Sequence, residues 1–364
     1  MLTGFDDYPI HQASVPVAHT ATADLNHYDR YFFNGYSADG TVYFAAAMGL
    51  YPNRHVADAA FSIVRGNRQA SVFRSQRAPV DRIDATDLGA VKVEVVVPLH
   101  RLRVVVDAPE HGISAEVEFV SRSPAIEEPH FFQRAGTRAF FDYTRLTQFG
   151  TWQGWIEIDG ERISVDGSLG SRDRSWGVRP VGEPMPSGAP VGEPQFFWLW
   201  APVNFESCST HFDVNEHGDG RRWHETGAIA PVGGDLQMMR TVDWRVTWRP
   251  GTRWADAFEY DLVAWDGTVT TVRLRPRYEF LMRGLGYGHP EFGHGYWKGE
   301  SALAGERLDL PPPDPCSRHH VHVQAICDAE LARQDGTLER GVGILEQLAI
   351  GPHPSGLRGI LDPS

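Results

Sequence analysis

The chain reads Asp166-Gly-Ser-Leu-Gly-Ser-Arg-Asp-Arg-Ser-Trp-Gly-Val-Arg179 near its middle, after a clear hairpin pattern and before a loop rich in proline and glycine. The glycines of this stretch allow tight turns and close approach of the backbone. If residues 172–176 are extended, successive side chains point to opposite faces. Asp173 would then point away from Arg172 and Arg174, which could pair elsewhere. Asp173 is therefore a candidate acid, and the alternative is a structural cluster of ion pairs.

Short segments of alternating apolar and polar residues surround this stretch on both sides. In residues 241–249, for example, two valines and two tryptophans alternate with polar residues, which is typical of a strand with one buried face. Several such segments are separated by Asp-Gly pairs, the strongest short signal of a β-hairpin, as at Asp159-Gly160. Strands are expected at residues 41–50, 59–65, 91–97, 102–106, 114–120, 147–158, 161–165, 196–201, 207–214, 223–230, 241–249, 258–264 and 269–275.

Four segments are harder to interpret. Residues 121–145 contain two prolines and an irregular pattern, which predicts a long crossing loop. Residues 181–194 are rich in proline and glycine, which predicts an exposed and mobile loop. Residues 319–329 could form a last strand, and residues 341–350 fit a short helix or a strand equally well.

The length and composition allow two domains and restrict the class of protein. A length of 364 residues suffices for two domains, and eleven tryptophans suit large sheets or an apolar ligand cavity. The net charge of −13 and the lack of a long basic run argue against nucleic acid as a partner. Three widely spaced cysteines fit a reducing compartment. No secretory signal pattern and no apolar run long enough for a transmembrane helix are visible, so a cytoplasmic location is expected.

Other groups of polar residues could take part in proton transfer. His211 alternates with Ser209 and Asp213 on one strand face and could reach into a cavity. Glu127, Glu128 and His130 form a second possible acid–base group in a loop. Tyr278 and His294 lie in stretches where charged and aromatic residues meet near glycines, and they are candidates for substrate binding.

The sequence gives little support for a metal site or a nucleotide site. His319, His320 and His322 are close together, and on a strand His320 and His322 would share a face, but no third metal ligand is identifiable, so ordinary strand histidines are favoured. The chain has no glycine-rich dinucleotide motif, no Walker loop and no nucleophile elbow. No metal and no cofactor are therefore predicted.

The segment Arg172-Asp-Arg-Ser-Trp-Gly177 resembles the Asp-His-Asn-Trp-Gly signature of carotenoid 1,2-hydratases (hydroxyneurosporene synthases) and related AttH-type proteins. Arg174 and Ser175 stand where that signature has His and Asn. The Trp-x-Trp strand that follows the signature in the family is matched by Phe196-Phe-Trp-Leu-Trp200. The resemblance implies an all-β fold of two consecutive lipocalin-like antiparallel β-barrel domains. It also implies enzymes that protonate or cyclise apolar, polyene-like substrates.

These observations lead to one main hypothesis and two alternatives. Domains are expected at residues 1–180 and 181–364. The main hypothesis is a cofactor-independent enzyme of the hydratase, lyase or isomerase type, which acts on an apolar terpenoid- or polyketide-like molecule in a β-barrel cavity. A buried Asp173 would supply the proton, Trp176, Trp198 and Trp200 would form walls, and Arg172 would contact the substrate. The alternatives are a non-catalytic carrier of a hydrophobic ligand, and a structural or interaction protein.

Overall fold

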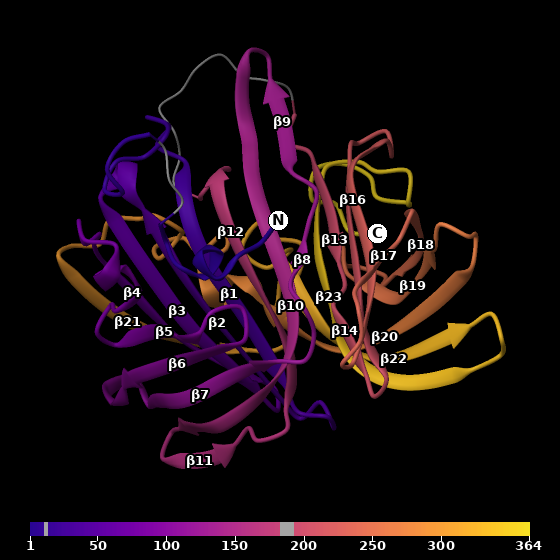
Figure 1. Ribbon diagram of the computed structural model, residues 1–364, viewed down its shortest axis with the longest axis horizontal. Coiled ribbons are helices and arrows are strands. Elements are labelled where there is room, and N and C mark those ends of the chain that lie inside the picture. The colour runs from indigo at the N-terminus through magenta and orange to yellow at the C-terminus, as the bar shows by residue number, and fades with distance from the viewer. Residues whose placement is uncertain (11–13, 183–192) are drawn as a thin grey trace. The chain divides into compact units, whose positions relative to one another are not determined.

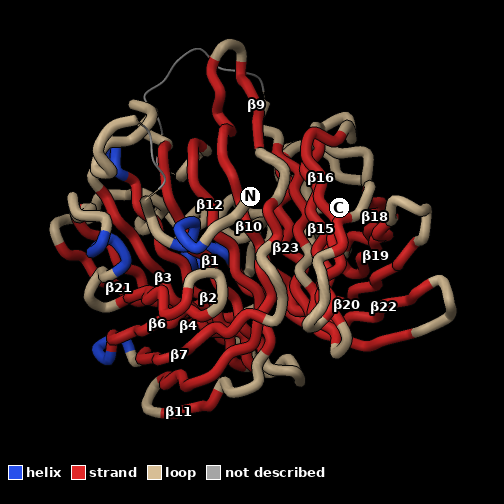
Figure 2. The backbone as a smooth tube through the Cα atoms, viewed as in Figure 1, coloured by secondary structure: helices blue, strands red, loops and turns tan. Residues whose placement is uncertain are grey.

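Antiparallel β-strands form nearly all of the regular structure in the computed structural model, which describes residues 1–10, 14–182 and 193–364 (Figures 1 and 2). The helices of these described residues are short 3₁₀ turns: η1 (Gly4–Asp7), η2 (Pro52–Arg54), η3 (Ile83–Thr86), η4 (Pro109–His111) and η5 (Met282–Leu285). None of them is long and apolar enough to cross a membrane.

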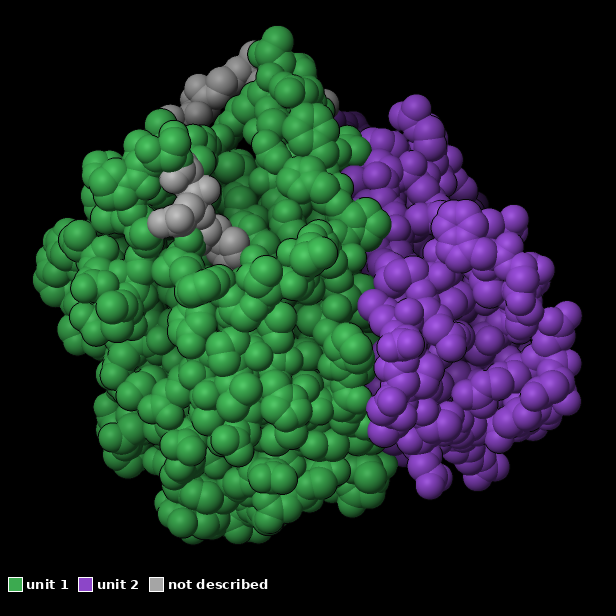
Figure 3. All heavy atoms as spheres, viewed as in Figure 1, with its two compact units in different colours: residues 1–189, 284–308 green, residues 190–283, 309–364 purple. Residues whose placement is uncertain are grey.

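The described chain forms two compact units, coloured separately in Figure 3. Unit 1 contains residues 1–189 and 284–308, and unit 2 contains residues 190–283 and 309–364. The segment 284–308 thus packs with residues that precede it by more than a hundred positions in the chain. The predicted division at residue 180 remains a prediction.

Unit 1 is built on a sheet with the strand order β21-β4-β3-β2-β1-β12-β10-β7-β6-β5, to which β8, β9 and β11 add by pairing with β10. The strands are β1 (His27–Tyr36), β2 (Val42–Tyr51), β3 (Val56–Arg65), β4 (Arg68–Arg77), β5 (Val91–Val97), β6 (Arg101–Ala108), β7 (Ile113–Ser121), β8 (Ile126–Glu127), β9 (Phe131–Ala135), β10 (Arg138–Ile158), β11 (Glu161–Ser164), β12 (Leu169–Val178) and β21 (Ser301–Asp309).

The sheet of unit 1 curls around a large apolar core. Phe61 on β3 and Val91 on β5 belong to the same buried cluster, although these strands are far apart in the strand order. At its centre Trp152 packs edge-on against Phe33, Phe44 and Phe119 with ring centroids 5.1–5.9 Å apart. Side chains that point inward on β1 and β12 therefore enter this barrel-like core, and their neighbours form the outer face of the sheet.

Unit 2 is built on a sheet with the strand order β17-β16-β15-β13-β23-β22-β20-β19-β18, and β14 pairs with β15 and β23. The strands are β13 (Phe196–Trp200), β14 (Val203–Phe205), β15 (Cys208–Glu216), β16 (Arg222–Pro231), β17 (Gln237–Met238), β18 (Thr241–Trp248), β19 (Ala255–Val263), β20 (Val269–Leu281), β22 (Val323–Arg333) and β23 (Leu338–Ile350).

The two ends of this second sheet also approach each other. Gly227 on β16 lies so close to β18 that a Cβ atom there would come within 2.5 Å of the Val242 side chain. The core contains Phe212 from β15 together with Phe258 and Tyr260 from β19. The predicted all-β class with two lipocalin-like, barrel-like antiparallel units is thus confirmed.

Most strand predictions are confirmed, and residues 341–350 belong to strand β23. The prediction of a loop over residues 121–145 is wrong, because β8, β9 and the first part of β10 lie there. β8 and β9 both pair with the long strand β10, so they depend on a partner that the local pattern does not reveal. The predicted mobile loop at 181–194 falls mostly on residues 183–192, which lie outside the described residues.

The expectation that His320 and His322 share a strand face is also wrong. Strand β22 begins at Val323, and the three histidines precede it. His320 lies in a turn, where its Nδ1 is 2.8 Å from the carbonyl oxygen of Asp314.

Candidate active site

Strand β12 separates Asp173 from its neighbouring arginines, as the alternation predicts. Arg172 points into the core of unit 1 and forms a buried ion pair with Asp7, with Nη1 2.6 Å from Oδ1. Arg174 points to the same side and pairs with Asp29. Asp173 lies on the outer face, half-buried, in register with Phe32 and Thr147 on the neighbouring strands. The two arginines are therefore structural members of the core.

A second predicted acid lies on the same outer face as Asp173. Glu128 is fully buried and accepts two hydrogen bonds from Arg145, at 2.7 and 2.6 Å, and one from the hydroxyl of Thr147 at 2.7 Å. A carboxylate held in this way by a bidentate guanidinium is a strong anchor and not a ready proton donor. Glu127 is about half exposed and pairs with the N-terminal ammonium group at 2.7 Å.

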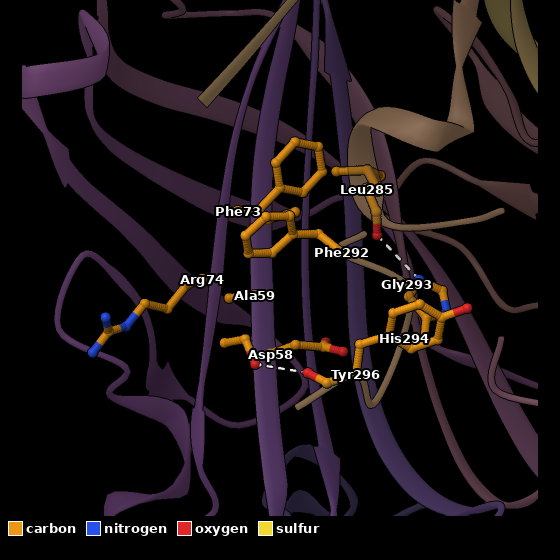
Figure 4. A pocket seen from close by; sticks show the side chains of 11 residues that line it. Asp58, Ala59, Phe73, Arg74, Leu285, Phe292, Gly293, His294 and Tyr296 are labelled. Atoms are coloured by element: carbon orange, nitrogen blue, oxygen red, sulfur yellow. Dashed lines mark hydrogen bonds between the residues drawn. The ribbon is translucent and has the colours of Figure 1, made fainter. Parts of the chain in front are cut away.

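His294 lies in a small pocket of unit 1, where the segment 284–296 covers the outer face of β3 and β4 (Figure 4). Phe292 of this segment stacks on Phe73 at 5.5 Å, and His294 Nε2 is 3.0 Å from the Leu285 carbonyl oxygen. Asp58 accepts hydrogen bonds from the Gly295 amide at 2.7 Å and from Arg30 at 3.2 Å. The pocket has a volume of about 10 Å³, which is room for one water molecule.

The carboxyl group of Asp58 is the unusual group of this pocket. Burial raises its pKa, and the guanidinium of Arg30, the Gly295 amide and the Tyr51 hydroxyl counteract this only in part, so that the pKa lies above its ordinary value. The contacts of Asp58 fasten the segment 284–296 to the sheet. We therefore assign Asp58 to the docking of this segment.

The substitution Asp58→Asn is expected to remove a pH dependence from the stability of unit 1. Because the pKa of Asp58 is higher in the folded state, the folded state binds the proton of this carboxyl group more tightly than the unfolded state does. The protonated group therefore stabilises the fold, and this stabilisation is lost as the pH rises through the folded-state pKa. The free energy of unfolding of the wild type minus that of the variant should fall as the pH rises from about 4. Urea unfolding over a pH series measures this difference. A difference that grows with pH would show instead that the ionised pair with Arg30 dominates.

Unit 2 carries a buried polar face on the side of its sheet opposite the apolar core. Trp198 on β13 donates from Nε1 to Asp213 Oδ1 at 2.7 Å. The other oxygen of Asp213 lies 3.3 Å from His224 Nε2, and both side chains are buried. Asp213 and His224 come from the adjacent strands β15 and β16, so the sheet register itself places them together. A carboxylate and an imidazole at this distance can exchange a proton.

A second carboxylate–imidazole pair lies on the same face. His322 Nε2 is 2.6 Å from Glu346 Oε1, and Gln324 donates to the other oxygen of Glu346 at 2.5 Å. The cross-strand register places Trp200 between Glu346 and Asp213. His211 points to the same face, fully buried, with its ring edge-on to Trp200 at 6.4 Å. We call the set Trp198, Trp200, His211, Asp213, His224, His322, Glu346 the polar face of unit 2.

The polar face combines three residues predicted from the sequence with four that were not. Trp198, Trp200 and His211 were candidates, whereas Asp213 was considered only as a neighbour of His211, and His224, His322 and Glu346 were not considered as acid–base groups on one face. His322 and Glu346 follow His211 by more than a hundred positions in the chain, so no local spacing connects them with it. Either carboxylate–imidazole pair could supply two of the three protein ligands that a catalytic zinc ion takes.

Two further predicted substrate-binding residues lie elsewhere. Trp176 lines a small hollow of unit 1 together with Tyr28 and Arg82. Tyr278 is half-buried on β20 of unit 2, next to an irregularity in the pairing with β22. These positions do not place either residue in the polar face of unit 2.

Comparison with known families gives a match over residues 2–358, to a family of unknown function (DUF8625). The chain belongs to this family. No curated protein matches the DUF8625 chain. Among solved structures, kievitone hydratase from Nectria haematococca aligns with a TM-score of 0.55 and 10% identity over 96% of both chains. This likeness shows the fold.

A second solved structure, transferrin binding protein B from Neisseria meningitidis, aligns with a TM-score of 0.12 and 6% identity, over 84% of this chain and 65% of that one. Such a score carries no argument about the DUF8625 protein.

Proposed function

We propose that the DUF8625 protein is an enzyme of the hydratase or lyase type that acts on an apolar small molecule at the polar face of unit 2. The observation that carries the proposal is the pairing of Asp213 with His224 and of Glu346 with His322 on one buried face. Burying polar side chains costs free energy, and buried acid–base groups cluster at functional sites. Two such pairs beside indole rings therefore indicate a functional site.

The two pairs suit the two proton transfers of a hydration. Adding water to a double bond needs a group that gives a proton to carbon and a group that takes a proton from water. Glu346 and Asp213 stand two strands apart, which corresponds to about 10 Å between their backbones. Trp200 lies between them in the register, and Trp198 adds a second indole ring. A flat apolar substrate resting on these rings would have a proton-transfer pair on either side.

The comparisons support the reaction class. The fold is shared with a protein whose name is kievitone hydratase, and the motif at residues 172–177 resembles that of carotenoid 1,2-hydratases. We propose a terpenoid- or polyketide-like substrate and chemistry without a cofactor. The alternative is a pure carrier of an apolar ligand, which would bind the probe without converting it.

Asp173 in unit 1 is the competing candidate for the acid. It lies on a different sheet face from Arg172 and Arg174. The two assignments predict different sensitive residues, so matched variants can separate them.

Kievitone, and the small molecules that co-purify with the protein from a cell extract, serve as probes for turnover. Mass spectrometry would detect the gain or loss of one water, with oxygen-18 water as the label. The variants Asp213→Asn and Glu346→Gln are expected to lower kcat/KM by about 10²–10⁴ each, the range for loss of a general acid or base. Native mass spectrometry should show that both variants still bind the probe.

His130→Asn is the matched control, because His130 and Asp142 form an exposed pair at 2.8 Å in unit 1. Its activity should equal that of the wild type. Loss of turnover in Asp173→Asn, with Asp213→Asn and Glu346→Gln fully active, would move the site to unit 1. Binding of a probe without turnover by the wild type would favour the carrier.

A further inference from the structure

A separate set of side chains lies at one end of the unit 2 barrel, on the core side of the sheet and away from the polar face. His353 Nε2 is 3.1 Å from Glu216 Oε2, and its Nδ1 is 2.9 Å from the hydroxyl of Ser355. The residues line an open hollow of about 530 Å³ with Trp244 and Val246 as its apolar wall. Barrel ends are common places for small-molecule sites.

The hydrogen bonds among Ser355, His353 and Glu216 determine which atoms carry the protons. The amide of Ser355 points at His353 Nδ1 at 3.3 Å, so Nδ1 is the acceptor nitrogen and Nε2 carries the hydrogen toward Glu216. The Ser355 hydroxyl therefore donates to Nδ1. This is the order that activates a serine: the hydroxyl faces a base, and the base is oriented by a carboxylate.

The imidazole and the carboxylate are both held rigidly. His353 stacks on Phe197 at 3.7 Å with the rings nearly parallel, and only 6% of its surface is exposed. Glu216 also accepts from Trp244 Nε1 at 2.9 Å and from Arg222 Nε at 3.1 Å. Although burial raises the pKa of Glu216, the hydrogen bonds from His353, Trp244 and Arg222 bring it below its ordinary value, so the group is ionised.

We propose that Ser355, His353 and Glu216 form a nucleophilic site for acyl transfer from small esters, independent of the proposed hydratase site. The Ser355 oxygen attacks the ester carbonyl and gives its proton to His353 Nδ1. The carbon–oxygen bond of the ester then breaks, and the departing alkoxide takes that proton. Water, deprotonated by His353, hydrolyses the acyl-serine and returns the hydroxyl. Glu216 stays ionised and acts as a positioning residue.

The charges of the hollow indicate which esters fit. Glu216 and Asp219 line it, while the guanidinium of Arg245 is held by Glu259 and Asp261 at 2.6 and 2.8 Å. Arg222 already pairs with Glu216, so both guanidinium groups are engaged by carboxylates while Asp219 adds negative charge to the hollow, which disfavours anionic esters. Neutral or cationic esters with a flat apolar group are expected to bind against Trp244.

A fluorophosphonate probe and p-nitrophenyl acetate test the site in the full-length protein. The probe should modify Ser355, identified by peptide mass spectrometry, and the ester should give a burst of one p-nitrophenolate per chain. Ser355→Ala should abolish both. Glu216→Gln should reduce the rate of labelling by about 10²–10⁴ and change its pH profile, because the imidazolium loses its counter-charge.

Ser121→Ala is the matched control. Ser121 lies 2.7 Å from His100 Nδ1 on an exposed part of unit 1, and no ion pair of His100 with a carboxylate occurs among the described residues. This variant should react like the wild type. A wild type that is not labelled, or one labelled at a residue other than Ser355, would overturn the proposal even if Ser355→Ala did not fold.

Discussion

Asp7→Ala is expected to lower the free energy of unfolding of unit 1 by about 3–5 kcal/mol, the usual cost of leaving one partner of a buried ion pair alone. Arg172 and Asp7 are both completely buried, and the guanidinium also donates to the Gln148 side chain at 2.9 Å. Removal of the carboxylate would leave a positive charge in an apolar core. Hydrogen exchange of unit 1 peptides during urea unfolding would measure the loss.

Two variants test whether the buried charge is the cause. The double variant Asp7→Leu with Arg172→Met should regain much of the lost stability, because replacing both charges by apolar groups is often neutral or stabilising. Glu300→Ala breaks an exposed pair with Arg77 and should cost about 0–1 kcal/mol. If Asp7→Ala and the double variant lose equal free energy of unfolding, the loss comes from the disturbance of η1 and not from the unpaired charge.

Trp152→Ala should lower the free energy of unfolding of unit 1 by about 3–5 kcal/mol, as large-to-small changes of buried aromatic residues do. Its indole touches three phenylalanine rings of the core and donates to the Asn34 carbonyl at 2.8 Å. Gly170 lies so close that a Cβ atom there would be 2.5 Å from the indole nitrogen. The surrounding chain is thus shaped to this side chain, and a smaller residue leaves a cavity.

Trp265→Ala is the control for this prediction, because Trp265 lies in a turn and is 75% exposed. Its replacement should change the stability of unit 2 by less than about 0.5 kcal/mol. The loss of stability in Trp152→Phe should lie between those of Trp152→Ala and Trp265→Ala, since phenylalanine keeps most of the packing and loses the hydrogen bond to Asn34. A Trp152→Ala variant as stable as the wild type would mean that the core collapses fully into the vacated space.

The sequence was sufficient to predict most of the strands outside residues 121–145 and the direction of side chains along them. The alternation in residues 241–249 and the Asp-Gly pair at 159–160 depend only on neighbouring residues, so the strand β18 and the turn between β10 and β11 follow directly. The same local rule correctly separated Asp173 from Arg172 and Arg174 on strand β12. The family resemblance added the expectation of two barrel-like units.

The buried ion pairs and hydrogen-bonded pairs depend on residues that are distant in the chain. Arg172 and Asp7 are 165 positions apart, and His353 and Glu216 are 137 positions apart. Alternation predicts that Arg172 turns inward, but not that η1 brings Asp7 to meet it. Likewise, the sequence gives no reason to connect His353 with Glu216.

The tertiary structure also decided the surroundings of each candidate residue. The segment 284–308 packs in unit 1, which places His294 beside Asp58. The sheet order of unit 2 places Glu346, Trp200 and Asp213 on adjacent strands, although β23 is the last strand of the chain and β13 and β15 come much earlier. Side-chain direction is a local property of the backbone, whereas strand order is set by the burial of whole sheets, and that is why only the folded chain reveals which acids and bases meet.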